Sequence, residues 1–177
     1  MPKFILKILV LGSVFFLMIP FSSCKLSFLG DSDEDIATEC STQLVEAINS
    51  SNVDNIAVLF SENSYTLGID GTTLVNFFKN GIEIVPVEHL SINSEEEIDG
   101  NEIFKTLEYE ICVRDLTTKE QYKFLFIQCV KNSLNNKDEG ITTLMIYNVK
   151  DEDAFTNWWR SFDSSENPQG IQLCYFD

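Results

Sequence analysis

Three consecutive segments rich in β-branched and aromatic residues dominate the middle of the chain. They span residues 104–114, 121–130 and 141–149. Such segments, joined by short polar loops, predict three antiparallel strands. With the first loop centred at Thr117–Thr118, Tyr109 lies opposite Phe126 and Ile111 lies opposite Phe124. Because directly opposed residues of an antiparallel pair point to the same side, this register gathers one nearly continuous apolar face.

The second loop extends this register to the third strand. Centring it at Asn135–Asn136 adds four residues to the face of Tyr109: Thr143, Met145, Tyr147 and Val149. The opposite face then carries a candidate interface made of Leu125, Ile127, Leu144 and Ile146. A sheet that is apolar on both faces must be covered on both. We therefore expect the N-terminal helices on one face, and the C-terminal segment, a second subunit or a ligand on the other.

The first part of the chain has helical periodicity. Apolar residues recur every four positions at Ile36, Cys40, Leu44 and Ile48, which predicts an amphipathic helix over residues 34–49. Ser32 and Asp35 match a capping box at its start. A short helix capped by Ser51 and a further helix over residues 73–79 are expected to follow.

The remaining segments complete the predicted α+β fold, in which N-terminal helices pack on a bent antiparallel sheet. Residues 82–92 are predicted to form a strand that lies at an edge of the sheet or contains a bulge, because Pro86 cannot donate a ladder hydrogen bond. The acidic residues 94–101 read as a solvated turn. A helix starting at Asp151 and a short strand from Ile171 to Tyr175 end the chain. We assign residues 34–177 to a single domain.

The N-terminus has the features of an export signal. Lys3 and Lys7 precede an apolar run over residues 8–19 that is shorter than the roughly 20 residues of a spanning helix. Ser22-Ser23-Cys24 resembles the lipobox of bacterial lipoproteins, which implies cleavage after residue 23, acylation of Cys24 and anchoring to the outer face of the cytoplasmic membrane. An ordinary cleaved signal or an uncleaved anchor are the alternatives. Residues 24–33 would form a tether.

The charge of the chain bears on its partners. The 28 acidic residues outnumber the 12 Lys and Arg residues and give a net charge of −16. Nucleic-acid binding requires the opposite balance, so nucleic acid is excluded as a partner. A net charge this negative is typical of a protein whose charged surface keeps it soluble.

A looser resemblance covers residues 36–149. Residues 47–54, followed by Leu59-Phe60-Ser61, resemble the opening of the nuclear-transport-factor-two-like (cystatin-like) superfamily. Together with the lipobox, the chain resembles bacterial lipoproteins of unknown function that carry this domain. The superfamily implies a cone-shaped domain with a pocket between helices and sheet. Some members are isomerases or dehydratases, and many bind ligands or dimerise. The candidate pocket residues here are Tyr65, Tyr109, Phe124, Phe126 and Tyr147.

The sequence contains few candidate catalytic or metal-binding residues. His89 is the one histidine and nothing in its surroundings marks a catalytic site. Cys40, Cys112, Cys129 and Cys174 lack metal-ligand spacing and are expected to be buried thiols. The sequence therefore predicts no catalytic residue, no metal and no cofactor.

Three functions remain open at this point. The leading hypothesis is a non-enzymatic, lipid-anchored binding or interaction domain, with the membrane, a second copy or an envelope protein as partner. The second is an isomerase-like or dehydratase-like enzyme that uses a buried carboxylate, such as Asp70, with a tyrosine in the cone. The third is a partner-docking lid within an envelope complex.

Overall fold

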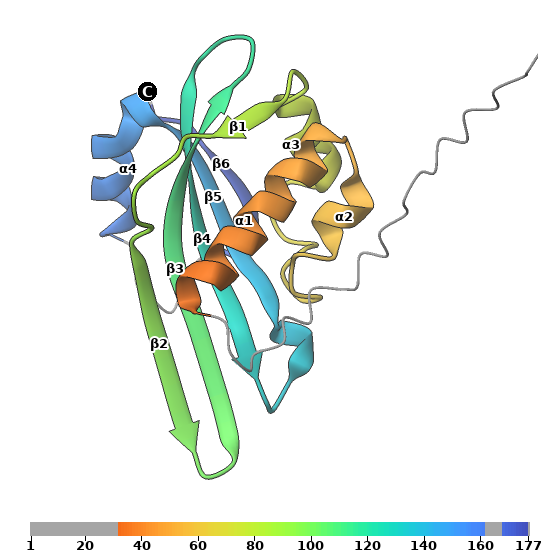
Figure 1. Cartoon of the computed structure of the whole chain (residues 1–177), viewed down its shortest axis with the longest axis vertical. Helices are drawn as coiled ribbons and strands as arrows, with labels where there is room; N and C mark the ends of the chain where they lie inside the picture. Colours follow the sequence, from red (N-terminus) through yellow and green to blue (C-terminus); the bar gives the residue numbers. More distant parts are fainter. Residues whose placement is uncertain (1–31, 162–167, 177) are drawn as a thin grey trace, which may run out of the picture.

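The protein has an α+β fold in which helices lie on both sides of one sheet (Figure 1). The computed structural model describes residues 32–161 and 168–176. Cys24, the signal segment and most of the tether lie outside these residues. The helices are α1 (Asp33–Asn49), α2 (Val53–Ala57), α3 (Gly71–Phe77) and α4 (Glu152–Trp159). The strands are β1 (Ile82–Ile84), β2 (Ile92–Asp99), β3 (Glu102–Asp115), β4 (Gln121–Asn132), β5 (Gly140–Asn148) and β6 (Gly170–Cys174).

The sheet is mostly antiparallel. Its order is β1-β3-β4-β5-β6, and β2 pairs with the other half of the β3 edge. Only β6 runs parallel to its neighbour, β5. Gly170 begins β6 with φ of 77°, and a Cβ atom there would lie 1.7 Å from the Leu67 carbonyl oxygen. Glycine is therefore required where β6 enters the sheet.

The predicted register of the first strand pair is confirmed. Tyr109 pairs with Phe126 and Ile111 pairs with Phe124. The loop between them is fixed by Asp115, whose side chain accepts hydrogen bonds from two successive backbone N–H groups, each at 2.7 Å.

The predicted register of the second pair is wrong by one residue. Leu125 pairs with Met145 and Ile127 with Thr143, because the loop contains a 3-10 turn and the ladder is irregular after Ile127. A shift of one residue moves every side chain to the other face. Tyr147 therefore lies on the face opposite Tyr109 and Phe124, contrary to the prediction.

The acidic stretch after Pro86 also differs from expectation. The strand that starts at Ile82 ends at Ile84, and residues expected to form a turn are strand β2. Nearly all of β2 is exposed, so its sequence shows no apolar alternation. Pairing with β3 through a tight turn at Gly100 defines this strand instead. The resulting hairpin projects beyond the rest of the domain (Figure 1).

The inner core lies between α1–α3 and the sheet. The four-residue period of α1 is confirmed, since Ile36, Cys40, Leu44 and Ile48 are all buried. The Ser32–Asp35 capping box is also confirmed. The other caps differ from prediction: Asn52 caps α2, and α3 begins two residues early, after its cap Asp70.

A smaller apolar cluster covers the outer face. Leu125, Met145 and Tyr147 are buried there beneath Phe155 of α4, with Trp158 and Trp159 packed against them. The rings of Phe155 and Tyr147 stack at 3.8 Å between centroids. The C-terminal segment thus supplies the second cover that the two-sided sheet requires.

Candidate binding pocket

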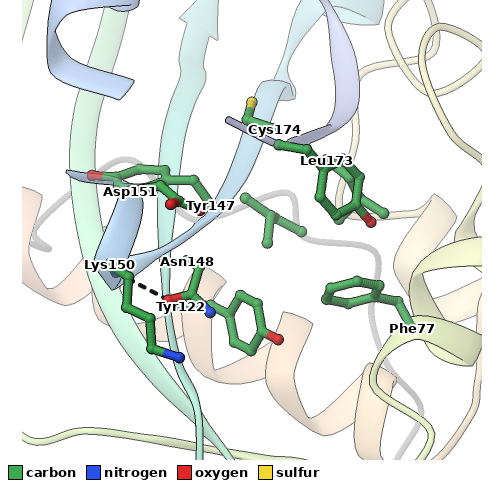
Figure 2. Close-up of a pocket in the computed structure, with 10 residues that line it drawn as sticks. Phe77, Tyr122, Tyr147, Asn148, Lys150, Asp151, Leu173 and Cys174 are labelled. Carbon is green, nitrogen blue, oxygen red and sulfur yellow. Dashed lines mark hydrogen bonds between the residues drawn. The ribbon is translucent and has the colours of Figure 1, made fainter. Parts of the chain in front are cut away.

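A hollow opens between α3 and the carboxyl ends of β5 and β6 (Figure 2). Its volume is about 280 Å³. An apolar cavity of about 150 Å³ suffices for benzene, so this hollow has room for a substituted single ring. The lining residues are Phe77, Tyr122, Ile146, Tyr147, Asn148, Lys150, Asp151, Leu173, Cys174 and Tyr175.

Aromatic contacts set one wall of this pocket. The last turn of α3 places Phe78 in the core, 1% exposed, and leaves Phe77 half-buried at the hollow. The Phe77 ring meets Tyr122 edge to face at 5.6 Å between centroids. Phe78 also meets Tyr122 edge to face and packs on Phe124. The wall is therefore supported by the inner core.

The rim beside Tyr122 is polar. The Tyr122 hydroxyl donates a hydrogen bond to Glu120 at 3.0 Å, and the Lys150 ammonium lies 3.4 Å from the same carboxylate. Burial, and next the bond to Glu120, raise the pKa of Tyr122 to about 12. Tyr122 thus keeps its proton at neutral pH and presents an uncharged ring to the pocket.

The opposite side of the hollow carries Asp151. Figure 2 shows Asp151 and Tyr147 across the hollow from Phe77. Asp151 is half-buried, and no salt bridge joins it to a cation within residues 32–161 and 168–176. It also precedes α4 without making a side-chain capping bond. Its carboxylate is therefore available to a ligand.

Of the five pocket residues expected from sequence, only Tyr147 lines this hollow. Tyr109, Phe124 and Phe126 are at most 2% exposed and fill the inner core. Tyr109 donates a hydrogen bond to Gln128 at 3.0 Å and stacks on Phe126. Tyr65 packs at the edge of the core near Phe60. Tyr147 does line the hollow, although its hydroxyl is engaged on the outer face.

The candidate interface residues are also separated. Leu125 lies under α4, and Leu144 and Ile146 face the inner core. Ile127 lines a different groove of about 400 Å³, together with residues such as Ser61, Asn63 and Asp138.

The outer face holds a charged cluster next to Tyr147. Its hydroxyl donates a short hydrogen bond to Glu110, whose other oxygen accepts one from Lys123 at 2.5 Å. Burial, and then the Glu110 contact, raise the pKa of Tyr147. Burial lowers the pKa of Lys123, but the Glu110 contact outweighs it and the net pKa is raised. This mutual pairing is typical of a structural ion pair.

Sequence reasoning missed Phe77, Leu173 and Asp151 as pocket residues. Phe77 belongs to the helix predicted over residues 73–79, but the strand across the hollow from it, β6, lies about 100 residues later in the chain. The alternation of Ile171, Leu173 and Tyr175 was a signal for a strand. It did not show that this strand runs parallel to β5.

Other chemical groups of the described chain form no site. His89 has a side chain that is 82% exposed and lies 4.0 Å from Glu34. Residues 32–161 and 168–176 hold no cluster of three or more metal-ligand side chains. No disulfide joins the four described cysteines, and burial raises the pKa of the Cys129 and Cys174 thiols to about 11. Within the described residues, no helix has the length and apolar character of a membrane span.

Comparison with known proteins gives one family. A model described as a domain of unknown function (DUF5104) matches residues 43–151, which is more than half of the chain. The match includes α2, α3 and strands β1 to β5, together with the C-terminal part of α1 from residue 43 onward. No curated protein and no solved structure matches the chain.

Proposed function

Because the chain belongs to the DUF5104 family, whose domain has no assigned function, we propose its role from the pocket and the N-terminal sequence. The protein is a lipid-anchored, extracytoplasmic domain that binds a small, largely apolar ligand between α3 and the sheet, without catalysis. The single observation that carries the binding role is the hollow of about 280 Å³ walled by Phe77, Tyr122 and Leu173. Pockets of predominantly apolar lining with a few polar groups are typical ligand sites.

The direction in which α1 runs supports an orientation of the pocket relative to the membrane. Asp33 at its start lies 2.5 Å from Lys105, near the first residues of β3. Asn49 at its end bonds to Ile82, which pairs with the last residue of β3. The 17 residues of α1 span roughly 25 Å at 1.5 Å per residue. A tether on Ser32 therefore enters the domain far from the pocket, and the pocket would face away from the membrane.

The cone-shaped superfamily remains part of this proposal. In favour are three helices that precede the sheet and close one face of it. The hollow lies between α3 and the last two strands, β5 and β6. A binding role agrees with a superfamily in which many members bind ligands.

The enzymatic alternative stays a prediction with weaker support. It needs a buried carboxylate beside a tyrosine. Glu120 beside Tyr122 is 41% exposed, and Asp70 serves as the exposed cap of α3. Glu110 beside Tyr147 is paired with Lys123 on the outer face. These contacts favour binding over catalysis.

Anchoring is tested at the lipobox cysteine. Cells expressing the full chain are labelled with radioactive palmitate and fractionated. The Cys24→Ser variant should lose the label and leave the membrane fraction, whereas Ser27→Ala should keep both. Label and membrane location that survive Cys24→Ser would contradict lipid anchoring.

Ligand binding is tested by filling the hollow. The protein, purified from membranes into nanodiscs, is titrated calorimetrically with the neutral probe 3-tert-butylphenol. Leu173→Trp should weaken binding at least about tenfold, because the indole occupies the probe's space. Leu134→Trp makes the same exchange at a side chain that is 74% exposed and should leave binding unchanged.

A second filling variant guards against misfolding. If Leu173→Trp unfolds the protein, Asn148→Trp places the indole at the half-exposed rim of the same hollow. Failure of the native protein to bind the probe, or equal binding by native protein and folded filling variants, would contradict the proposed site.

A further inference from the structure

We infer that the pocket selects an organic cation, of the class of tertiary and quaternary alkylammonium ions, over neutral or anionic ligands of the same shape. This inference rests on the proposed binding function and names its ligand class. It follows from the aromatic wall, from the Asp151 carboxylate across the hollow and from the charge of the whole chain.

The aromatic wall provides the attraction for a cation. Phe77, Tyr122 and Tyr175 line one hollow, and the edge-to-face contact of Phe77 with Tyr122 fixes two of these rings. A cation within about 6 Å of a ring face is attracted by the ring quadrupole, more strongly where water is excluded. A tertiary or quaternary alkylammonium ion is weakly hydrated, so it can exchange water for contact with aromatic rings. A primary ammonium needs several hydrogen-bond acceptors in addition.

The local charge balance at the rim is negative. Lys150 is the only cationic side chain that lines the described hollow, and its side chain is 76% exposed. Its ammonium lies 3.4 Å from Glu120, which largely neutralises it. Asp151 has no such counter-ion among the described residues. The charge left to a ligand is therefore the Asp151 carboxylate.

The other polar groups at the hollow do not favour an anion. The Asn148 side-chain oxygen already accepts the Lys150 backbone N–H at 3.0 Å. The Cys174 thiol, whose pKa burial raises to about 11, stays uncharged at neutral pH. The net charge of −16 adds a long-range field that concentrates cations and repels anions.

The test uses three probes that share one ring and differ in charge. 3-Hydroxyphenyltrimethylammonium is the cation, 3-tert-butylphenol its neutral carbon isostere and 3-hydroxybenzenesulfonate an anion. Calorimetric titration of the full protein in nanodiscs should give roughly tenfold tighter binding of the cation than of the neutral isostere. The anion should bind weakest, and the preference for the cation should fall as salt is added.

Variants locate the preference. Asp151→Asn should remove most of the affinity advantage of the cation over the neutral isostere, because it removes the carboxylate charge from the hollow. Asp153, two residues later, is exposed on α4. Asp153→Asn removes one carboxylate charge as well, but it should have little effect on the preference for the cation. Because Asp151 makes no capping bond, its replacement should not disturb α4.

Each outcome decides a different point. Equal or weaker binding of the cation than of the neutral isostere would overturn the inference and leave the proposed binding function standing. Tighter binding of the anion, abolished by Lys150→Gln, would overturn it in favour of an acidic ligand. An Asp151→Asn protein that keeps the full preference would also overturn it. No binding of any probe would reject the binding function itself.

Discussion

Tyr122 shows how one residue joins the core, the pocket and the rim. Its ring packs against Phe77 and Phe78, and its hydroxyl bonds to Glu120. The sequence places it correctly opposite Val113 on the inner face. What the sequence lacks is the position of Phe77, because the contact depends on how α3 closes over the end of the sheet.

The raised pKa of Tyr122 predicts a loss of stability at alkaline pH. The unfolded chain loses this proton near pH 10 and the folded protein only near pH 12. The stabilisation is therefore fully present below about pH 10 and is lost as the pH rises toward the folded value. Urea unfolding between about pH 9 and about pH 11.5 should show a steeper decline for the native protein than for Tyr122→Phe. Parallel curves for the two proteins would contradict the assignment.

Strand β5 is the element whose register sequence reasoning placed wrongly. The third strand of the meander is apolar at Leu144, Met145, Ile146 and Tyr147 in succession, so its period cannot choose a face. The irregularity after Ile127 decides the register. The first strand pair was predictable because its apolar residues alternate cleanly and its loop is short.

Removing Phe155 should detach α4 from the sheet. This side chain is 4% exposed and covers Tyr147, Leu125 and Met145. We expect Phe155→Ala to lower the free energy of unfolding by about 3–5 kcal/mol. Both tryptophans of the chain lie on α4, so their fluorescence should shift to the red.

The control for this variant is Phe104→Ala, at a side chain that is 43% exposed. It should change the free energy of unfolding by less than about 1 kcal/mol and leave the emission unchanged. An unshifted emission of Phe155→Ala would show that α4 is held by other contacts.

Asn49 links the end of α1 to the first strand of the sheet. Its side chain accepts the Ile82 N–H at 2.8 Å and donates to the Ile82 carbonyl at 2.9 Å. Asn49→Ala should lower the free energy of unfolding by about 1–3 kcal/mol, because both backbone groups lose their partner. Asn49→Asp keeps the acceptor but places a charge against the carbonyl, so it should not restore stability. Urea unfolding measures both, and full stability of Asn49→Ala would contradict this role.

At the scale of the whole molecule, charge repulsion is the dominant electrostatic feature. The net charge of the chain is −16, and several of its ion pairs, such as Lys137 with Glu62, are exposed. Exposed pairs contribute little, and self-repulsion opposes the compact state.

Salt should therefore stabilise the protein. Raising NaCl from about 0.02 M to about 0.5 M screens the repulsion and should raise the Tm by about 2–4 °C. Differential scanning calorimetry of the purified protein measures this shift, with uncharged sucrose of matched osmolarity as the comparison. A Tm that falls with added salt would show that ion pairs outweigh the repulsion.

The sequence by itself determined the α+β class, the four-residue period of α1, the capping box and the pairing of β3 with β4. These follow from local periodicity and from a loop too short to allow another register. Tertiary structure alone decided the strand β2, the faces of β5 and the parallel β6. It also decided the meeting of Phe77, Asp151 and Leu173 around one hollow. Their positions depend on backbone pairing and on contacts between distant segments, which no local pattern of side chains encodes.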